Sequence, residues 1–156
     1  MTRVVLNFTV LGHPQPGGSK RAVPIPGGKV RVIDANRKVR PWRDSVAAAA
    51  QEAMGDREPL AGPLALGLTF YIQRPQGHYT KVAQKISRSA PRRPVTRPDL
   101  TKYIRAVEDA CTSILWRDDS QVVTQVARKF YGHPERCEVV VQTINHDVEV
   151  TDGGTS

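Results

Sequence analysis

Four segments have the residue pattern of β-strands: residues 3–11, 64–72, 121–130 and 138–144. In the second segment the large apolar residues all fall on one side, as they do in a strand with one buried face. Turn-forming residues at 132–135 separate the last two segments, so we expect these segments to pair as antiparallel neighbours. A shorter extended segment is predicted at residues 29–33.

Two further segments repeat apolar residues with the period of about 3.6 that is typical of α-helices. The first is expected to run from Pro41 to a stop at Gly55. Its apolar face consists of Trp42, Val46, Ala49 and Ala53. The second is expected from Pro98 to Leu115, and its core stripe consists of Leu100, Ile104, Val107, Cys111 and Ile114.

Strands and helices in this order predict a single α+β domain, in which a mixed β-sheet packs against two helices. The chain has 156 residues, which suits one domain; we place it at residues 1–146 and expect a frayed tail at 147–156. Residues 74–98 contain several prolines and no apolar period, so we expect a long loop. Such a loop in a small domain is usually either functional or disordered.

The positive charge is concentrated in two stretches of the sequence. The formal net charge is +8, and residues 74–97 contain seven Lys or Arg residues and no Asp or Glu. Residues 17–43 contain eight basic residues and one acidic residue, whereas residues 135–156 are acidic. A single basic run is usually a solvated surface, but two in one small domain favour a surface that binds nucleic-acid phosphates.

The sequence contains no sign of a membrane segment or of a disulfide framework. The apolar run near the N-terminus is too short to cross a bilayer and lacks the features of a secretory signal. We therefore expect a cytoplasmic protein. Cys111 and Cys137 fit neither a zinc spacing nor a pair of bonded cysteines, so both are interpreted as small buried apolar residues.

Carboxylates near the second helix are candidate ligands for Mg²⁺, which prefers oxygen donors and supports phosphodiester hydrolysis. Asp99 begins this helix directly after the basic loop, and Asp118 and Asp119 follow its end. Each has a structural alternative. Asp99, or Thr96 before it, could cap the helix, and Asp118 and Asp119 could belong to a solvated turn.

Helix geometry adds Glu108 to these candidates. Thr101, Arg105 and Glu108 are spaced i, i+4 and i+7, so they share one face at the border of the apolar stripe. A partly buried Glu108 would lie near the other carboxylates. Alternatively, Glu108 could be an exposed partner of Arg105, and Asp109 could also pair with Arg105.

Two central motifs resemble the signature of RusA-type Holliday junction resolvases. They are residues 97–110 and residues 116–122, and the segments 17–21 and 38–43 resemble the leader of many phage-encoded members. The resemblance covers roughly residues 5–145. It implies a RusA-like fold and two metal ligands, because Asp99 matches the first aspartate of the family motif Asp-Leu-Asp-Asn-x-x-Lys and Asp119 matches the later Asp-Asp-x-Gln-Val aspartate.

The sequence departs from the family motif at three positions. Thr101 occupies the place of the second aspartate, Lys102 that of the asparagine, and Arg105 that of the lysine. We hypothesise that Glu108 replaces the carboxylate missing at Thr101. Arg105 keeps the positive charge, but a guanidinium does not give up its proton, so we expect it to stabilise phosphate.

The resemblance implies a homodimeric, Mg²⁺-dependent endodeoxyribonuclease of recombination and repair, in which Mn²⁺ can substitute for Mg²⁺. Such an enzyme resolves four-way or other branched DNA by paired phosphodiester hydrolysis, in the host cytoplasm if a phage encodes it. We expect Asp99, Glu108, Asp119 and Arg105 to be catalytic, with Asp118 as a further metal ligand. The candidates for contacts with the DNA backbone, chosen on charge alone, are Lys20, Arg21, Arg88, Arg92, Arg93 and Lys102.

Two other functions remain open from the sequence. The loss of a carboxylate at Thr101 is compatible with a non-catalytic protein that binds branched DNA by its shape. An RNA-binding domain of the translation machinery is also compatible with the charge, although the few aromatic residues do not form a stacking stripe.

Overall fold

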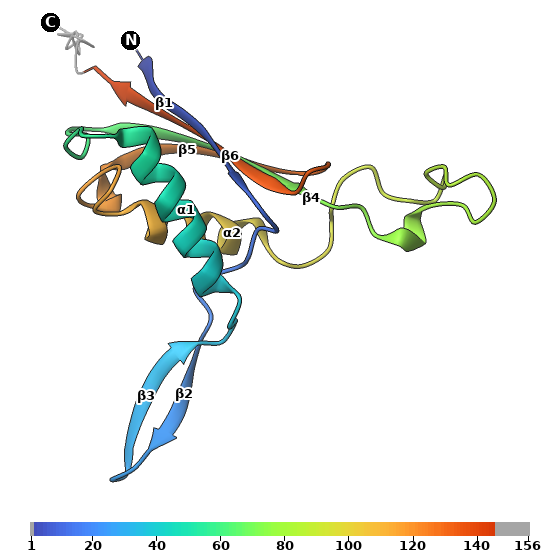
Figure 1. Ribbon diagram of the computed structural model, residues 1–156, viewed down its shortest axis with the longest axis horizontal. Helices are drawn as coiled ribbons and strands as arrows, with labels where there is room; N and C mark the ends of the chain where they lie inside the picture. Colours follow the sequence, from blue (N-terminus) through green and yellow to red (C-terminus); the bar gives the residue numbers. More distant parts are fainter. Residues whose placement is uncertain (1, 146–156) are drawn as a thin grey trace, which may run out of the picture.

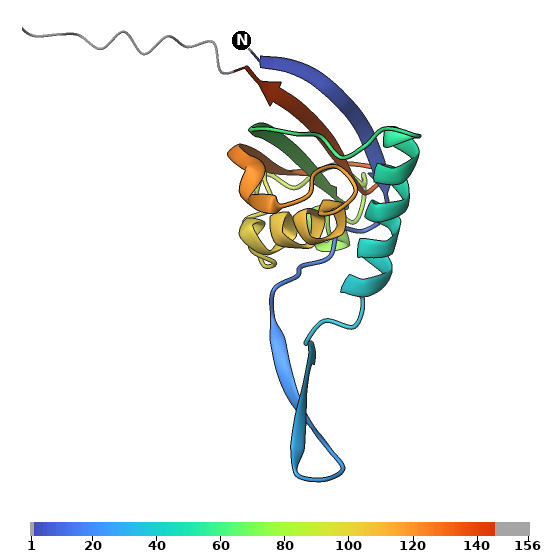
Figure 2. The ribbon, with the colours of Figure 1, turned by 90° about the vertical axis from the view of Figure 1, so that its left-hand side faces the viewer.

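A four-stranded mixed β-sheet forms one layer of the molecule, and two helices cover its concave face (Figures 1 and 2). Figure 1 shows this arrangement in a computed structural model, which describes residues 2–145. The sheet has the strand order β1-β6-β4-β5, and the prediction of one α+β domain with a mixed sheet and two helices is confirmed. Its elements are β1 (Thr2–Leu11), α1 (Val39–Met54), β4 (Leu64–Ile72), α2 (Leu100–Cys111), β5 (Val122–Tyr131) and β6 (Arg136–Ile144). The predicted tail, 147–156, lies outside the described residues.

The core lies between the sheet and the helices. Strand β4 contributes a continuous row to it, because every second residue of the strand faces the helices and carries a large apolar side chain that is fully buried. The predicted inner residues are confirmed; they are Leu64, Leu66, Leu68 and Phe70. Phe70 stacks on Tyr103 of α2 with ring centroids 5.2 Å apart, so the central strand is joined directly to the second helix.

Helix α1 follows the predicted pattern closely. It begins at Val39, two residues before the expected start, and ends at Gly55, which has a positive φ of 56° and donates its N–H to the Gln51 carbonyl. Trp42 and Val46 are buried as expected. Ala49 and Ala53 are only partly buried, because the face turned to the core continues through Ala50 and Met54 instead.

Helix α2 is shorter than predicted, and its buried face is rotated. It ends at Cys111 because Thr112 is extended and Ser113 has a positive φ of 76°, which turns the chain back so that Leu115 enters the core. The fully buried helix residues are Tyr103, Ala106, Val107 and Cys111. The expected stripe residues Leu100, Ile104 and Ile114 are only partly buried.

The predicted pairing of the last two strands is wrong. Strand β6 pairs antiparallel with β1 and β4, and β5 pairs with the other side of β4 in parallel orientation. Strand β4 thus separates two strands that are neighbours in the sequence, and the chain crosses its end where Gly132 donates its N–H to the Ile72 carbonyl. Strand β4, the most apolar strand, takes a central position because neighbouring strands then cover both of its edges, and it gains most from this burial. Strand β5 is therefore left as an open edge.

The expected extended segment at residues 29–33 is confirmed as β3 (Lys29–Asp34), but its partner was not predicted. Strand β2 (Lys20–Ile25) pairs with β3 in a two-stranded hairpin that projects from the body (Figure 1). The sequence of β2 contains Pro24 and two basic residues and therefore lacks a clear strand pattern. Proline is tolerated there because a two-stranded sheet consists of edges alone.

Both cysteines are buried and unpaired, as predicted. Burial raises the pKa of the Cys111 thiol to about 12, and it also raises the pKa of Cys137. Each thiol is therefore protonated at neutral pH and acts as an apolar core residue. In the part of the chain that the structure describes, neither helix is long and apolar enough to cross a membrane.

Candidate active site

Strand β5 fixes both ends of helix α2. Near the end of the helix, the Gln125 side-chain amide donates a hydrogen bond to the Glu108 carboxylate. Near its start, the Lys129 ammonium donates to the carbonyls of Thr96 and Pro98, at 3.2 and 3.0 Å. The helix therefore runs antiparallel to β5, and the candidate residues of the helix and of the following turn have defined positions along this edge strand.

Glu108 lies in a half-buried position beside Asp119. Burial raises the pKa of the Glu108 carboxyl, and the nearby charge of Asp119 raises it further. The hydrogen bond from Gln125 and the charge of Arg105 act in the opposite direction. Two carboxylates that repel each other in this way form a site at which a bound cation is stabilised. The hypothesis that Glu108 lies with the carboxylates after the helix is thus supported for Asp119.

Asp118 builds the turn that presents Asp119. Its carboxylate accepts a hydrogen bond of 2.9 Å from the Ser120 N–H, and this bond holds the pKa of Asp118 below its usual value. The side-chain oxygen of Gln121 accepts hydrogen bonds from the backbone N–H groups of Arg117 and Asp118, while its amide group donates to the Leu60 and Gly62 carbonyls. Gln121 therefore attaches the turn to the segment before β4.

Asp99 occupies the N-cap position of α2, but its side chain makes no capping hydrogen bond. The structure therefore confirms the predicted N-cap position of Asp99, but the Asp99 carboxylate does not satisfy the first N–H groups of the helix. Asp99 and Glu108 are nine residues apart, which corresponds to about 13 Å along a helix axis. Within residues 2–145, no three His, Cys, Asp or Glu side chains approach closely enough to hold a metal ion together. A single chain therefore brings Glu108 and Asp119 together but does not add Asp99 to them.

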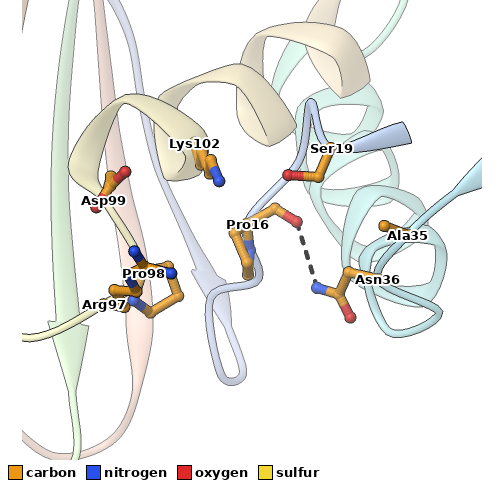
Figure 3. Close-up of a pocket in the computed structure, with 8 residues that line it drawn as sticks. All are labelled: Pro16, Ser19, Ala35, Asn36, Arg97, Pro98, Asp99 and Lys102. Atoms are coloured by element: carbon orange, nitrogen blue, oxygen red, sulfur yellow. Dashed lines mark hydrogen bonds between the residues drawn. The ribbon is translucent and has the colours of Figure 1, made fainter. Parts of the chain in front are cut away.

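A pocket of about 380 Å³ opens beside Asp99, at the start of α2 (Figure 3). Arg97, Lys102 and Asp99 line one side, and Ser19 and Asn36 line the other. The Asn36 amide donates to the Pro16 carbonyl at 3.3 Å and so joins the two segments that form that second side. Two cationic side chains and a hydroxyl around an open pocket are suited to an anionic group such as a DNA phosphate.

Two glycines place the N-terminal segment directly on α2, which the sequence did not predict. The Gly17 N–H donates to the Lys102 carbonyl at 2.9 Å, and a Cβ on Gly17 would come within 3.2 Å of the Ala106 backbone. Gly18 has a positive φ of 85°, and a Cβ there would come within 2.5 Å of the Arg105 side chain. The consecutive glycines were the only signal in the sequence, because they allow the chain to approach a helix closely.

Arg105 extends along this glycine segment and forms no ion pair. The four ion pairs within residues 2–145 join other residues, so the alternatives that paired Arg105 with Glu108 or Asp109 are wrong. Its charge nevertheless lies near enough to Glu108 to lower the pKa of that carboxyl. A permanent cation near the carboxylate pair is thus available to a phosphate group.

The structure distributes the predicted DNA-contact residues over three regions. Lys102 lies at the pocket beside Asp99, and Lys20 and Arg21 lie on the projecting hairpin. The long loop carries Arg88, Arg92 and Arg93. The Arg93 guanidinium lies 4.5 Å from the centre of the Phe130 ring, and Arg74 holds the loop by a hydrogen bond of 2.7 Å to the Pro91 carbonyl. Charge alone missed Gln125 and Lys129, whose roles depend on packing against α2.

Comparison with known proteins finds matches that include the segments of this candidate active site. The model of the family described as Endodeoxyribonuclease RusA matches residues 13–142. The match includes the glycine segment, the whole of α2 and the turn with Asp119. A protein of Bacillus subtilis (strain 168), named Uncharacterized protein YqaN, is 31% identical over 141 residues, which make up 90% of this chain and 97% of that protein.

Proposed function

This chain belongs to the RusA endodeoxyribonuclease family, and from that membership we propose that it is a Mg²⁺-dependent, homodimeric enzyme that cuts branched DNA at paired positions. The observation that carries this proposal is that Gln125 fixes the Glu108 carboxylate at the end of α2, within electrostatic reach of Asp119 and of the Arg105 cation. The family is one of nucleases that act on DNA junctions. The metal, the paired cuts and the dimer are the parts that we propose.

The donor atoms of Glu108 and Asp119 fit Mg²⁺. This ion is commonly held by one or two carboxylates, with water molecules and substrate phosphates completing its coordination. When bound, it supplies electrostatic stabilisation to the phosphate that is hydrolysed. Arg105 stabilises the same negative charge without exchanging a proton, and Lys102 binds a neighbouring phosphate at the pocket. Asp118 fixes the turn that carries Asp119, and we propose it as a further ligand of Mg²⁺.

A second copy of the chain offers a way to add Asp99 to this pair. Strand β5 is an open edge with Val123 and Val126 exposed, so two copies can pair their β5 strands antiparallel about a twofold axis. Because α2 runs antiparallel to β5, such pairing places the start of one α2 beside the end of the other. Asp99 of the partner subunit then lies toward Glu108 and Asp119.

The test of the nuclease activity is the cleavage of a labelled four-way junction. With Mg²⁺ or Mn²⁺ we expect symmetric nicks in two opposed strands, and with EDTA we expect binding without nicks. Denaturing gels report the nicks, and a linear duplex of the same sequence serves as the control substrate. Junction binding without nicking in Mg²⁺ and Mn²⁺ would instead support a non-catalytic branched-DNA-binding protein.

Mixed dimers test whether Asp99 acts across the dimer. Asp99→Asn and Asp119→Asn are each expected to be inactive, but a heterodimer of the two variants contains one site with both wild-type residues if the site is shared between chains. Co-expression with two different affinity tags isolates this heterodimer, and we expect it to nick one strand of the junction. No recovery of nicking would show that Asp99 does not complete the site of the other chain.

A further inference from the structure

The β2–β3 hairpin projects from the body as an arm without support from the main sheet (Figures 1 and 2). Within the described residues, its two strands pair only with each other, and all of their side chains are exposed or half-exposed. Isolated two-stranded hairpins are marginally stable in water. An arm of this kind is therefore expected to gain order when it binds a partner.

The base of the arm is attached firmly to the body. The Asp34 carboxylate accepts a hydrogen bond of 2.5 Å from the Lys20 ammonium and another of 2.5 Å from the Arg43 guanidinium of α1. The Ala35 N–H also donates to the Ser19 carbonyl at 2.9 Å. These contacts tie both strands to the start of α1, so the direction of the arm relative to the body is defined.

The two faces of the arm differ in chemistry, because residues that pair across the strands share a face. One face contains the Lys20–Asp34 ion pair at the base and then only apolar residues; its pairs are Lys20–Asp34, Ala22–Val32 and Pro24–Val30. The other face contains three cations and no acidic residue; its pairs are Arg21–Ile33, Val23–Arg31 and Ile25–Lys29. We call the second one the basic face.

We propose that the basic face of the arm, with Arg21, Lys29 and Arg31, is a second DNA-contact surface that enters the major groove of a duplex arm of the branched substrate. This inference rests on the proposed function. Within residues 2–145 these three cations form no ion pair, so they are available to the phosphates of DNA. Lys20, the fourth basic residue of the arm, lies on the other face and pairs there with Asp34. The major groove is wide enough to accept a two-stranded ribbon.

The proposed DNA contact of the arm is separate from the carboxylates that are proposed to cleave the DNA. Figure 1 shows the arm and the long basic loop of residues 74–98 projecting in different directions from the region of α2. The pocket at Asp99 lies at the base of the arm, because Ser19 and Ala35 line it. A duplex that is bound by the arm thus leads toward the start of α2.

The test compares two sets of substitutions on the same hairpin. The variant Arg21→Ala/Lys29→Ala/Arg31→Ala removes the basic face, and Val30→Thr/Val32→Thr changes the exposed apolar face without changing the charge. Binding of a fluorescent four-way junction is measured by anisotropy at several salt concentrations, and circular dichroism checks that each variant is folded. For the basic-face variant we expect the plot of log K against log salt to become less steep. The magnitude of its negative slope should decrease by about two to three, since each lost phosphate contact removes about 0.9.

The outcomes are distinct. The valine variant is expected to bind with the wild-type slope, and an unchanged slope in the basic-face variant would overturn the proposal. If sedimentation shows that the valine variant alone changes the oligomeric state while the basic-face variant binds normally, the arm contacts a second copy rather than DNA. Failure of the wild-type protein to bind or nick the junction would instead count against the proposed function itself.

Discussion

Replacing Glu108 with Gln is expected to reduce Mg²⁺-dependent nicking of a four-way junction by at least about 100-fold, because even outer residues of metal sites cost 10- to 100-fold when changed. The amide keeps the size of the side chain and can still pair with Gln125, so the fold is retained. It removes one of the two charges that stabilise the cation beside Asp119. Single-turnover nicking at saturating enzyme measures the loss, and anisotropy measures the junction affinity.

The matched control for this substitution is Glu52→Gln, which makes the same chemical change on the exposed side of α1. We expect it to nick at the wild-type rate. Wild-type nicking by Glu108→Gln would disprove the hypothesis that Glu108 replaces the carboxylate missing at Thr101. Asp119→Asn should lose nicking to a similar degree, because the two side chains act on the same ion.

Replacing Trp116 with Ala is expected to lower the free energy of unfolding by about 3–5 kcal/mol, the usual effect of truncating a buried aromatic residue. Trp116 is fully buried, and its indole N–H donates to the Thr112 hydroxyl at 3.2 Å. Its carbonyl also accepts the Ser113 N–H. Because small domains have only about 5–15 kcal/mol of stability in total, urea unfolding should show a large decrease in the midpoint.

Trp42 provides a comparison for the hydrogen bond of Trp116. Both indoles are buried, but the Trp42 N–H has no hydrogen-bond partner in the described part of the chain. Trp116→Phe removes a paired donor, whereas Trp42→Phe removes an unpaired one, so we expect Trp116→Phe to cost about 1 kcal/mol more. Equal losses would indicate that the Trp116–Thr112 bond contributes nothing to stability.

The loss of Trp116 should also affect cleavage. Trp116 precedes the turn of Asp118 and Asp119, and its contacts fold residues 112–116 back onto the end of α2. The distance from Glu108 to Asp119 depends on this fold, since Glu108 belongs to the helix and Asp119 to the turn. The turn is thus both a structural unit and the support of a proposed metal ligand.

The parts of the candidate site that the sequence predicted are those that depend on spacing within one element. Glu108 was found because it shares a helix face with Thr101 and Arg105, and Asp119 because it follows the helix in a recognisable motif. Gln125, Lys129 and the contact of Gly17 with α2 were not found. Each of these depends on which segment lies against the helix, and a linear pattern does not contain that information.

The sequence by itself determined the elements with strong periodicity and the segregation of charge. Leu64–Ile72 was predicted at its observed bounds, because alternating large apolar residues have only one way to be buried in a strand. Tertiary structure alone decided which strands pair. Strand β4 lies between β5 and β6 because burial in the sheet outweighs proximity along the chain, and this leaves β5 as the open edge.

Tertiary structure also decided the grouping of the carboxylates and the division of the arm into two faces. Asp99 and Asp119 belong to the two central motifs of the sequence, but α2 separates them as a rigid rod, so one chain brings only Glu108 and Asp119 together. Lys20 and Arg21 are adjacent in the sequence, but strand geometry points them to opposite faces. In both cases the sequence shows which charged residues are present. Only the packing of the chain decides which of them lie close together.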